Sequence, residues 1–477
     1  MSASRVTADT AFRVAERLEK VEGPWDVYAE RSRSHELHFG GRGIEFVRGP
    51  IVLEGYGIRL LLPREGKTAI GFQASTDASA KGVEAVLRDA EGVSKYSEFP
   101  AKDVTLPSGV NGTPPGPEIV DRSVWENAPA ALTEYCATLF AAFEGKKDVA
   151  ISFGSVKAHR TEVTIANSAG LASSYANTAI EAEIAVKSSG GPEGTAPGEY
   201  WVNLSGRRLE PQDLPRQAEE WGRYASDARR AKSPPSGDLT VVLPPSILEP
   251  ILPAALGFKL SGRGQLRELS PAVGSVVGPS DLTLVDDGTI DWATGSSPVD
   301  DEGTPQRRRN LIQGGKVSEL LYDALYGSAL SHPSSGSGLR HGFDFAAHRF
   351  ARVPGPFTTT LSIPPGQGGS DQELIEAAGD GIWAQQIGWP SPDGLTTAFG
   401  GEIRIGYRIR NGKLAEPIRG GTIGGLVLAP AGTPSLLSNI VATGSHPVLS
   451  GGVLVPSLLI RPLTVAGDER AAAMGGA

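Results

Sequence analysis

Two clusters of acidic residues lie close together in the middle of this 477-residue chain, and they are its clearest candidates for chemistry. The first cluster ends the apolar run Leu284-Val285, and the second follows within the segment 297–305. The acidic residues are Asp286, Asp287, Asp300, Asp301 and Glu302. Carboxylates this close in sequence can bind a divalent cation or act as a general acid and base. Asp is also favoured in turns and at helix N-caps, so a purely structural interpretation competes with both.

The histidines and the cysteine do not form a recognisable metal-ligand pattern. His35 and His38 lie three apart in a strand-like run, so they are expected to point to opposite faces. The histidines of a Ser/Gly-rich connector lie nine and seven residues apart, and they are His332, His341 and His348. Cys136 is the only cysteine, which excludes Cys-based zinc sites and an intrachain disulfide. No GxSxG motif of a serine hydrolase is present. The sequence therefore predicts no catalytic zinc in this chain.

The first half of the chain alternates between helical and strand-like patterns. Apolar spacing predicts helices over residues 8–21, 80–90, 124–143 and 212–231. Strand-like runs punctuated by Gly and Pro lie between them, at residues 25–30, 35–39, 43–47, 57–62, 68–72, 148–153, 161–167, 179–186 and 199–204. The order from helix through strands to helix occurs twice, with a spacing of about 122 residues. This repetition is consistent with an internal duplication, and chance recurrence in two α+β units explains it equally well.

Strand signals dominate the second half of the chain. They lie at residues 239–243, 282–285, 316–322, 358–363, 403–409 and 424–428, separated by Gly-containing connectors. The proline-containing segment 232–238 is the predicted domain boundary. The predicted fold class is α+β: an N-terminal α+β domain over residues 1–232, then a β-rich, sandwich or barrel-like domain over residues 238–465. The small, polar segment 466–477 is predicted to be a disordered tail.

Composition excludes several classes of protein. The net charge is −9, and Arg307, Arg308 and Arg309 form the only tight basic run, which argues against nucleic-acid binding. No stretch approaches 18 consecutive apolar residues, and the N-terminus lacks the apolar core of a signal peptide. A soluble, cytoplasmic protein without a membrane partner is expected.

Several segments, taken in order, resemble the TldD/PmbA (TldE) family. Residues 284–289 match its VDDGT strand end, and residues 297–307 match its DDEGxxxxR segment. Residues 57–59 and 71–76 resemble its "GIR … GFASTN" pair, and residues 165–170 resemble its NSxG turn. Further matches are a GYxIxNGK segment at residues 406–413, an RGxxIxG segment at residues 419–425 and an LxNI segment at residues 437–440. The anchors span about residues 57–440. Each alone is weak, but the ordered set is specific.

The resemblance also shows where this chain departs from the family's zinc-bearing members. It implies that TldD-type members carry a HExxxH helix just upstream of the VDDGT strand and a Cys near the C-terminus, whereas TldE-type members lack this zinc set. The corresponding segment here, residues 245–257, contains no His. Pro250 and Pro253 are expected to disturb a regular ligand helix, and Glu249 is expected to be a cap or an exposed residue.

The resemblance therefore implies a non-catalytic, TldE-like subunit without a cofactor, paired as a heterodimer with a TldD-type zinc peptidase. The pair would process unfolded or modified peptides, and strand edges in the C-terminal half would hold them by strand addition. The candidate substrate or interface loops contain Asp286, Asp287, Asp300, Asp301, Glu302 and Arg307. Two alternatives remain open: a peptide-binding or maturation protein that acts without proteolysis, and an enzyme that uses the acid loops with an exogenous metal.

Overall fold

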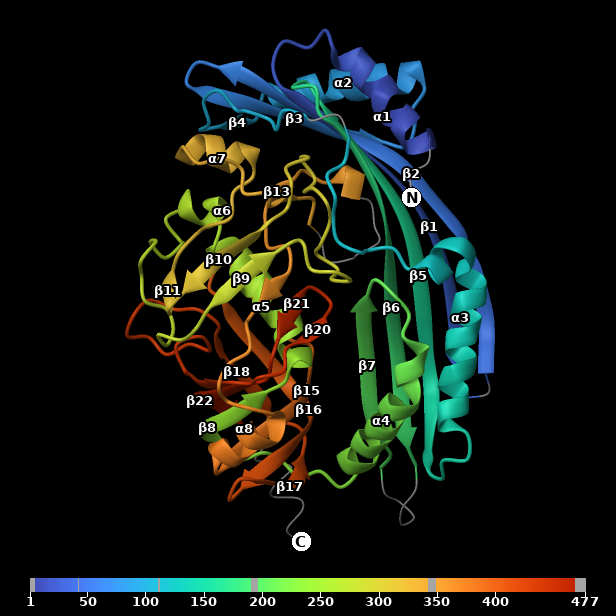
Figure 1. The fold of residues 1–477 in the computed structure, drawn as a ribbon, viewed down its shortest axis with the longest axis vertical. Helices are drawn as coiled ribbons and strands as arrows, with labels where there is room; N and C mark the ends of the chain where they lie inside the picture. The colour runs from blue at the N-terminus through green and yellow to red at the C-terminus, as the bar shows by residue number, and fades with distance from the viewer. Residues whose placement is uncertain (1–4, 42, 110–111, 190–195, 342–348, 468–477) are drawn as a thin grey trace.

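The computed structural model describes the chain except for residues 1–4, 42, 110–111, 190–195, 342–348 and 468–477. The N-terminal half is a seven-stranded sheet with the strand order β4-β3-β2-β1-β5-β6-β7, flanked by helices (Figure 1). Its strands are β1 (Trp25–Gly40), β2 (Gly43–Arg64), β3 (Lys67–Ser75), β4 (Glu98–Phe99), β5 (Val149–Asn167), β6 (Ala172–Ser188) and β7 (Gly198–Gly206). Its helices are α1 (Arg5–Leu18), α2 (Ala80–Ser94), α3 (Arg122–Phe143), the short 3₁₀-helix η1 (Pro211–Asp213) and α4 (Leu214–Ala228).

Alternation along the central strand β1 separates the two faces of this sheet. Val27 and Ala29 pack in one apolar cluster with α1 and α2, and Leu37 and Phe39 pack in another with α3 and α4. All four residues occupy odd positions of a strand that pairs with β5 without a register shift. Because side chains of a strand alternate between faces, helices α1 to α4 pack on one face of the sheet.

The opposite face packs against the C-terminal half of the chain. Tyr28, at an even position of β1, lies in a cluster with Val163 and Ile165 of β5. Val299 and Phe350, from the C-terminal half, complete the same cluster. Val299 directly precedes the second acid cluster, so this packing brings that cluster to the sheet.

The C-terminal half contains a six-stranded sheet, β11-β10-β9-β14-β21-β20, and a five-stranded barrel. The barrel has the order β15-β8-β22-β18-β16 and closes because β15 also pairs with β16. The strands are β8 (Gly237–Leu243), β9 (Leu284–Asp287), β10 (Arg308–Gln313), β11 (Lys316–Val317), β12 (Gly338–Leu339), β13 (Gly355–Pro356), β14 (Leu361–Ser362), β15 (Gly381–Gly388), β16 (Ala398–Arg410), β17 (Lys413–Ile418), β18 (Thr422–Leu426), β19 (Ile440–Thr443), β20 (Val448–Ser450), β21 (Val453–Val455) and β22 (Leu458–Ala466). The helices are α5 (Pro245–Lys259), α6 (Gly262–Gln265), α7 (Ala324–Leu330), the 3₁₀-helix η2 (Arg349–Ala351) and α8 (Asp371–Ala378).

The predicted α+β class and the barrel-like C-terminal half are confirmed, and the differences lie in the extent of elements. The runs predicted at residues 25–30 and 35–39 form one strand, β1, because pairing with both β2 and β5 keeps the polar residues between them in the ladder. The strand predicted at residues 316–322 ends at Val317. Leu320 and Leu321 instead enter the core as irregular chain.

The helix–strands–helix order does occur twice in the N-terminal half, and the two units meet at the antiparallel pair β1–β5. An origin by duplication stays a prediction. The division into domains at residues 232–238 also stays a prediction; α4 ends at Ala228 and β8 begins at Gly237. Of the predicted tail, Ala466 instead ends β22 and pairs with Thr422. Residues 468–477 lie outside the described residues.

Candidate functional site

The two acids at the end of β9, Asp286 and Asp287, lie in different environments. Asp286 is fully buried, and its carboxylate lies 2.6 Å from Nη1 of Arg309 and accepts the backbone N–H of Thr359 at 2.6 Å. Burial raises the pKa of Asp286 to about 6, and Arg309 opposes this rise. Asp287 is half-buried and accepts hydrogen bonds from the backbone N–H and the hydroxyl of Thr289, at 2.9 and 2.6 Å. Asp286 thus forms a core ion pair, while Asp287 stabilises a turn.

The second acid cluster forms a tight turn, which Asp300 organises. Its carboxylate accepts the backbone N–H groups of Glu302 at 3.0 Å, Thr304 at 2.8 Å and Gly338 at 2.9 Å. Burial and the neighbouring Glu302 hold the pKa of Asp300 well above its ordinary value. Asp300 therefore closes its own turn and anchors β12 to it.

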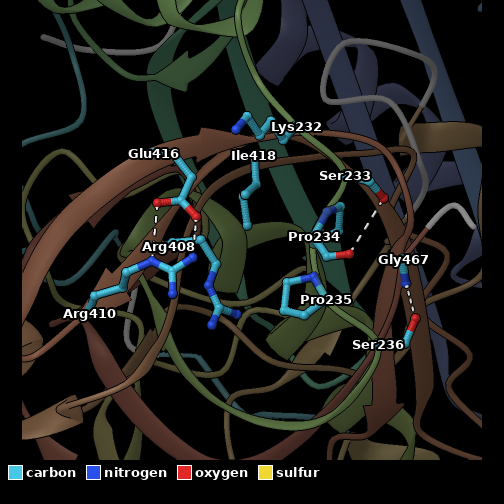
Figure 2. A pocket seen from close by; sticks show the side chains of 10 residues that line it. All are labelled: Lys232, Ser233, Pro234, Pro235, Ser236, Arg408, Arg410, Glu416, Ile418 and Gly467. Atoms are coloured by element: carbon cyan, nitrogen blue, oxygen red, sulfur yellow. Dashed lines mark hydrogen bonds and ion pairs between the residues drawn. The ribbon is translucent and has the colours of Figure 1, made fainter. Parts of the chain in front are cut away.

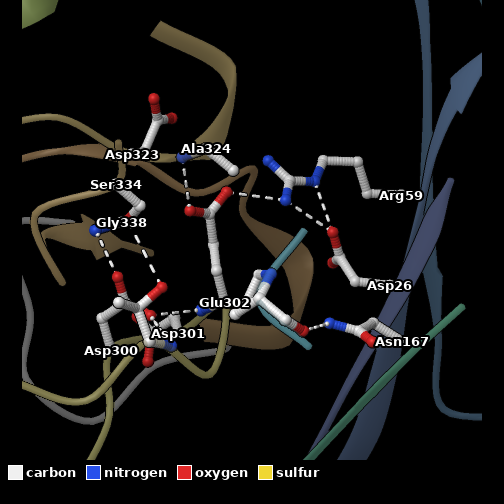
Figure 3. Close-up of polar contacts among 12 residues, drawn as sticks. Asp26, Arg59, Asn167, Asp300, Asp301, Glu302, Asp323, Ala324, Ser334 and Gly338 are labelled. Atoms are coloured by element: carbon white, nitrogen blue, oxygen red, sulfur yellow. Dashed lines mark hydrogen bonds and ion pairs between the residues drawn. The ribbon is translucent and has the colours of Figure 1, made fainter. Parts of the chain in front are cut away.

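Glu302 reaches from this turn to the N-terminal sheet (Figure 3). Its Oε1 lies 2.7 Å from Nη2 of Arg59, whose Nε donates to Asp26 at 2.7 Å. The other oxygen, Oε2, accepts the backbone N–H of Ala324 at 2.8 Å. Arg59 and Glu302 are completely buried, and Asp26 is nearly so. One guanidinium thus bridges carboxylates from the two halves of the chain.

Asp301 makes a second connection of the same kind. Its carboxylate accepts the backbone N–H of Arg340 at 2.6 Å and lies 2.7 Å from Nη2 of Arg349. The side chain of Arg340 in turn reaches Asp26, at 3.1 Å. The acid turn is therefore tied to β1 twice, through Arg59 and through Arg340.

This network buries more carboxylates than guanidinium groups. Asp323, at the N-cap of α7, accepts the backbone N–H of Tyr326 with one oxygen, while its Oδ2 has no partner among the described residues. Burial and Glu302 raise the pKa of Asp323 well above its ordinary value, as they do for Asp300. Because ionised carboxylates are costly to bury without partners, burial favours the protonated forms of Asp300 and Asp323 over the charged forms.

The structure thus brings Asp300, Asp301 and Glu302 together at the contact between the halves, while Asp286 and Asp287 lie apart at the end of β9. Arg307 joins neither group; it is exposed, 4.0 Å from Glu319, and the buried arginine of this segment is Arg309. Sequence reasoning missed Asp26 and Arg59 as partners of the acids. The sequence feature that could have indicated a buried ionic partner was Arg59, the single charged residue within the apolar run 58–62.

A cavity of about 790 Å³ lies next to the acid turn, between the two halves. Pro298 lines it from the C-terminal half, and Tyr175 of β6 lines it from the sheet. The guanidinium of Arg208 lies 4.9 Å from the centre of the Trp292 ring on its wall. Arg122 and Arg208 line the cavity together with the acids Glu118 and Asp121, so its walls combine apolar surface with charges of both signs.

Helix α5, which precedes β9, is apolar on its buried side. Ile247, Leu248, Ile251 and Leu252 pack into the C-terminal core. The expected disturbance by Pro250 and Pro253 is wrong, because α5 continues through both, and its packed apolar face compensates for the two missing N–H donors.

The expected cap or exposed position of Glu249 is also wrong. It is partly buried within α5, and its carboxylate lies 3.5 Å from the hydroxyl of Ser205 on β7. Burial raises the pKa of Glu249 to about 7.

Three of the described histidines stack on aromatic rings. His38 stacks on Phe46 with ring centres 4.3 Å apart, and His332 stacks on Tyr322 at 4.5 Å. His341 stacks on Phe357 at 3.8 Å, and His348 lies outside the described residues. Across the part of the chain that the structure describes, no group of three His, Cys, Asp or Glu residues is arranged to hold a metal ion.

Comparison with known proteins places the chain in a family. The family model for the PmbA/TldA metallopeptidase C-terminal domain matches residues 236–467. A metalloprotease TldD homolog from Haemophilus influenzae is 30% identical over 209 residues, which cover 43% of this chain and 42% of the relative. One from Buchnera aphidicola subsp. Acyrthosiphon pisum is 27% identical over 243 residues, or 49% of each chain. The chain belongs to the TldD/PmbA family. The alignments span less than half of these relatives' lengths.

Solved structures extend the likeness in fold to nearly the whole TldD/PmbA chain. TldE from Thermococcus kodakarensis has a TM-score of 0.77 and 18% identity, covering 95% of this chain and 100% of its own. A proposed modulator of a DNA gyrase from Thermotoga maritima has a TM-score of 0.78 and 18% identity, covering 96% and 100%. At this identity the likeness establishes a shared fold.

The zinc that the family resemblance implies does not fit the residues of α5 in this TldD/PmbA chain. Zinc in proteins takes imidazole, thiolate or carboxylate ligands, usually three or more. Helix α5 offers Glu249 as its single carboxylate and no His or Cys. Cys136 lies buried in α3, where burial raises its pKa to about 12 and disfavours the thiolate.

Among the described residues, no helix is long and apolar enough to cross a membrane.

Proposed function

We propose that this chain is a TldE-like, non-catalytic subunit that assists a zinc-bearing TldD-type partner in the proteolysis of unfolded or modified peptides. The observation that carries the proposal is the composition of α5, the helix that precedes the VDDGT strand. Its buried positions are filled by aliphatic side chains, and it has one carboxylate where a zinc site needs several ligands. Buried ion pairs join the two halves of the chain, because Arg59 contacts both Asp26 and Glu302.

The arrangement around the acid turn supports a role in peptide binding. The cavity beside Pro298 and Trp292 is concave, and its walls combine apolar surface with charged groups of both signs, which suits an extended peptide. Asp300, Asp301 and Glu302 are buried, so they would not contact the peptide directly. Their role would be to fix the position of the loop that lines the cavity. In the described C-terminal half, β17 is the longest strand at a sheet edge. The backbone of Lys232 already bonds Pro417 and Arg419 at its C-terminal end, so strand addition is proposed along the part of β17 before Pro417.

The test combines the purified chain with a TldD-type protein that carries the HExxxH helix. The proposal expects stable co-purification, no cleavage of an unfolded polypeptide by this chain alone, and chelator-sensitive cleavage by the pair. Chelator-sensitive cleavage by this chain alone would refute it. Binding of peptides without any effect on a partner's proteolysis would favour the maturation-protein alternative instead.

Variants of the acid loops separate a direct role from a supporting one. Asp287→Ala and Arg307→Ala change residues outside the buried network, whereas Asp301→Asn changes a residue within it. If the loops contact the partner or peptide, the first two variants weaken pairing or cleavage, while Arg307→Ala melts at the wild-type temperature and Asp287→Ala, which loses two hydrogen bonds of its turn, melts slightly below it. If the acids only support the cavity, Asp301→Asn alone reduces cleavage, together with thermal stability.

A further inference from the structure

A pocket with several basic side chains opens at one end of the five-stranded barrel (Figure 2). It encloses about 360 Å³. The segment between α4 and β8 forms one wall, and strands β16 and β17 form another. The lining residues are Lys232, Ser233, Pro234, Pro235, Ser236, Arg408, Arg410, Glu416, Ile418 and Gly467.

Strand register places Arg408 at the inner side of the barrel mouth. Arg408 pairs directly with Ile382, near the start of β15, and directly opposed residues of antiparallel strands share a face. Ile382 belongs to the core cluster that also contains Val241 and Ile460 from other barrel strands. The side chain of Arg408 therefore lies on the face that lines the barrel, with Ile418 as the apolar floor beside it.

The charges of the pocket are unbalanced. Lys232, Arg408 and Arg410 are cationic, and Glu416 is the one carboxylate among the lining residues. Glu416 pairs with Arg410 at 2.6 Å, and this hydrogen bond, with Arg408 nearby, lowers the pKa of Glu416 to about 2. The Nη1 atom of Arg408 is buried and has no hydrogen-bond partner among the described residues. A buried donor without an acceptor is costly, so a bound acceptor would stabilise this arrangement.

We propose that this barrel-mouth pocket binds a small oxyanion, a carboxylate or a phosphate, held by Arg408 and Lys232. The fork of an Arg guanidinium matches two oxygens of either group, and the ammonium of Lys232 adds a second charge. Pro234 and Pro235 shield the site from water on one side, which strengthens both interactions. The mouth of a barrel is a frequent location for ligands. The proposal is independent of the partner and of peptide cleavage.

Calorimetric titration of the full chain with inorganic phosphate and, separately, with acetate tests the site. The wild type should bind at least one of them. Arg408→Gln should weaken that binding at least about tenfold, because it removes a charge-assisted pair of hydrogen bonds. Glu416→Gln should strengthen it, since it removes the carboxylate and releases Arg410. Arg419→Gln is the matched control: it changes the same charge at an exposed residue outside the pocket lining, and it should bind as the wild type does.

The melting temperature of Arg408→Gln without anion shows that the variant is folded. It should equal or exceed that of the wild type, because the variant lacks the unsatisfied guanidinium. Tighter binding of phosphate than of acetate identifies a phosphorylated ligand, and the reverse identifies a carboxylate. The proposal is overturned if neither anion binds the wild type at about 10 mM, or if Arg408→Gln binds as tightly as the wild type.

Discussion

Replacing Arg59 with Met tests whether the buried ionic network holds the two halves of the chain together. Arg59 is fully buried and lies 2.7 Å from both Asp26 and Glu302. Met fills a similar volume without charge, so the two carboxylates lose their shared counter-ion. Removing one partner of a buried ion pair costs about 3–5 kcal/mol. With an unfolding entropy of about 2 cal/mol/K per residue, this loss lowers the melting temperature by about 3–5 °C.

The assay is urea and thermal unfolding of Arg59→Met, Glu302→Gln and the double variant. The double variant should recover part of the loss of Arg59→Met, because Gln carries no charge that needs a counter-ion. Arg17→Met is the control; Arg17 pairs with Glu84 at 3.3 Å on the surface, where a pair contributes at most about 1 kcal/mol. The reasoning is refuted if Arg59→Met loses no more stability than Arg17→Met, or if the losses in the double variant simply add.

Three further predictions concern single residues. Burial raises the pKa of Glu249 to about 7, so the folded state binds this proton more tightly than the unfolded state, and stability falls as pH rises from about 4.5 to 7. Glu249→Gln should flatten that dependence and be the more stable chain at pH 8 in urea unfolding, whereas equal slopes would contradict the assignment. Gly314 and Gly315 both have positive φ. A Cβ at Gly314 would lie 3.7 Å from the Ser280 oxygen, an ordinary contact, whereas a Cβ at Gly315 would clash with the Gly278 oxygen at 2.3 Å. Gly314→Ala should therefore cost about 1–2 kcal/mol and Gly315→Ala more, as measured by urea unfolding; similar losses would count against this packing. Cys136 should react with a thiol reagent only after denaturation, because it is buried and its pKa is raised to about 12; rapid labelling of the native chain would disprove its burial.

The helices of the N-terminal half follow from the sequence because each has one apolar face. The extent of the strands does not, because polar residues in the middle of β1 interrupt the apolar pattern while the ladders on both sides continue. Helix α5 is also hard to predict from local sequence, but for a different reason. Its two prolines oppose a helix locally, and tertiary packing of the aliphatic face outweighs them.

The acid clusters could be selected from sequence, but not the contacts they make. Glu302 meets Arg59 across 243 positions of the chain, and no local pattern encodes such a pairing. The choice of Arg307 over Arg309 failed for a related reason. Arg307 lies just before β10 begins, whereas Arg309 lies within β10 directly opposite Asp286, so selecting the buried arginine requires the start of β10 and its register against β9, which local sequence leaves open.

The long connection between Arg59 and Glu302 has a consequence during synthesis. Ribosomes add about 5–20 residues per second, so Arg59 leaves the ribosome tens of seconds before Glu302 exists. In that interval the sheet face that will meet the acid turn is open to water, with Tyr28 and Phe72 uncovered beside Arg59. A nascent chain of this protein thus exposes the apolar side chains of this sheet face until Glu302 has been made, and exposed apolar surface of this kind promotes aggregation during synthesis.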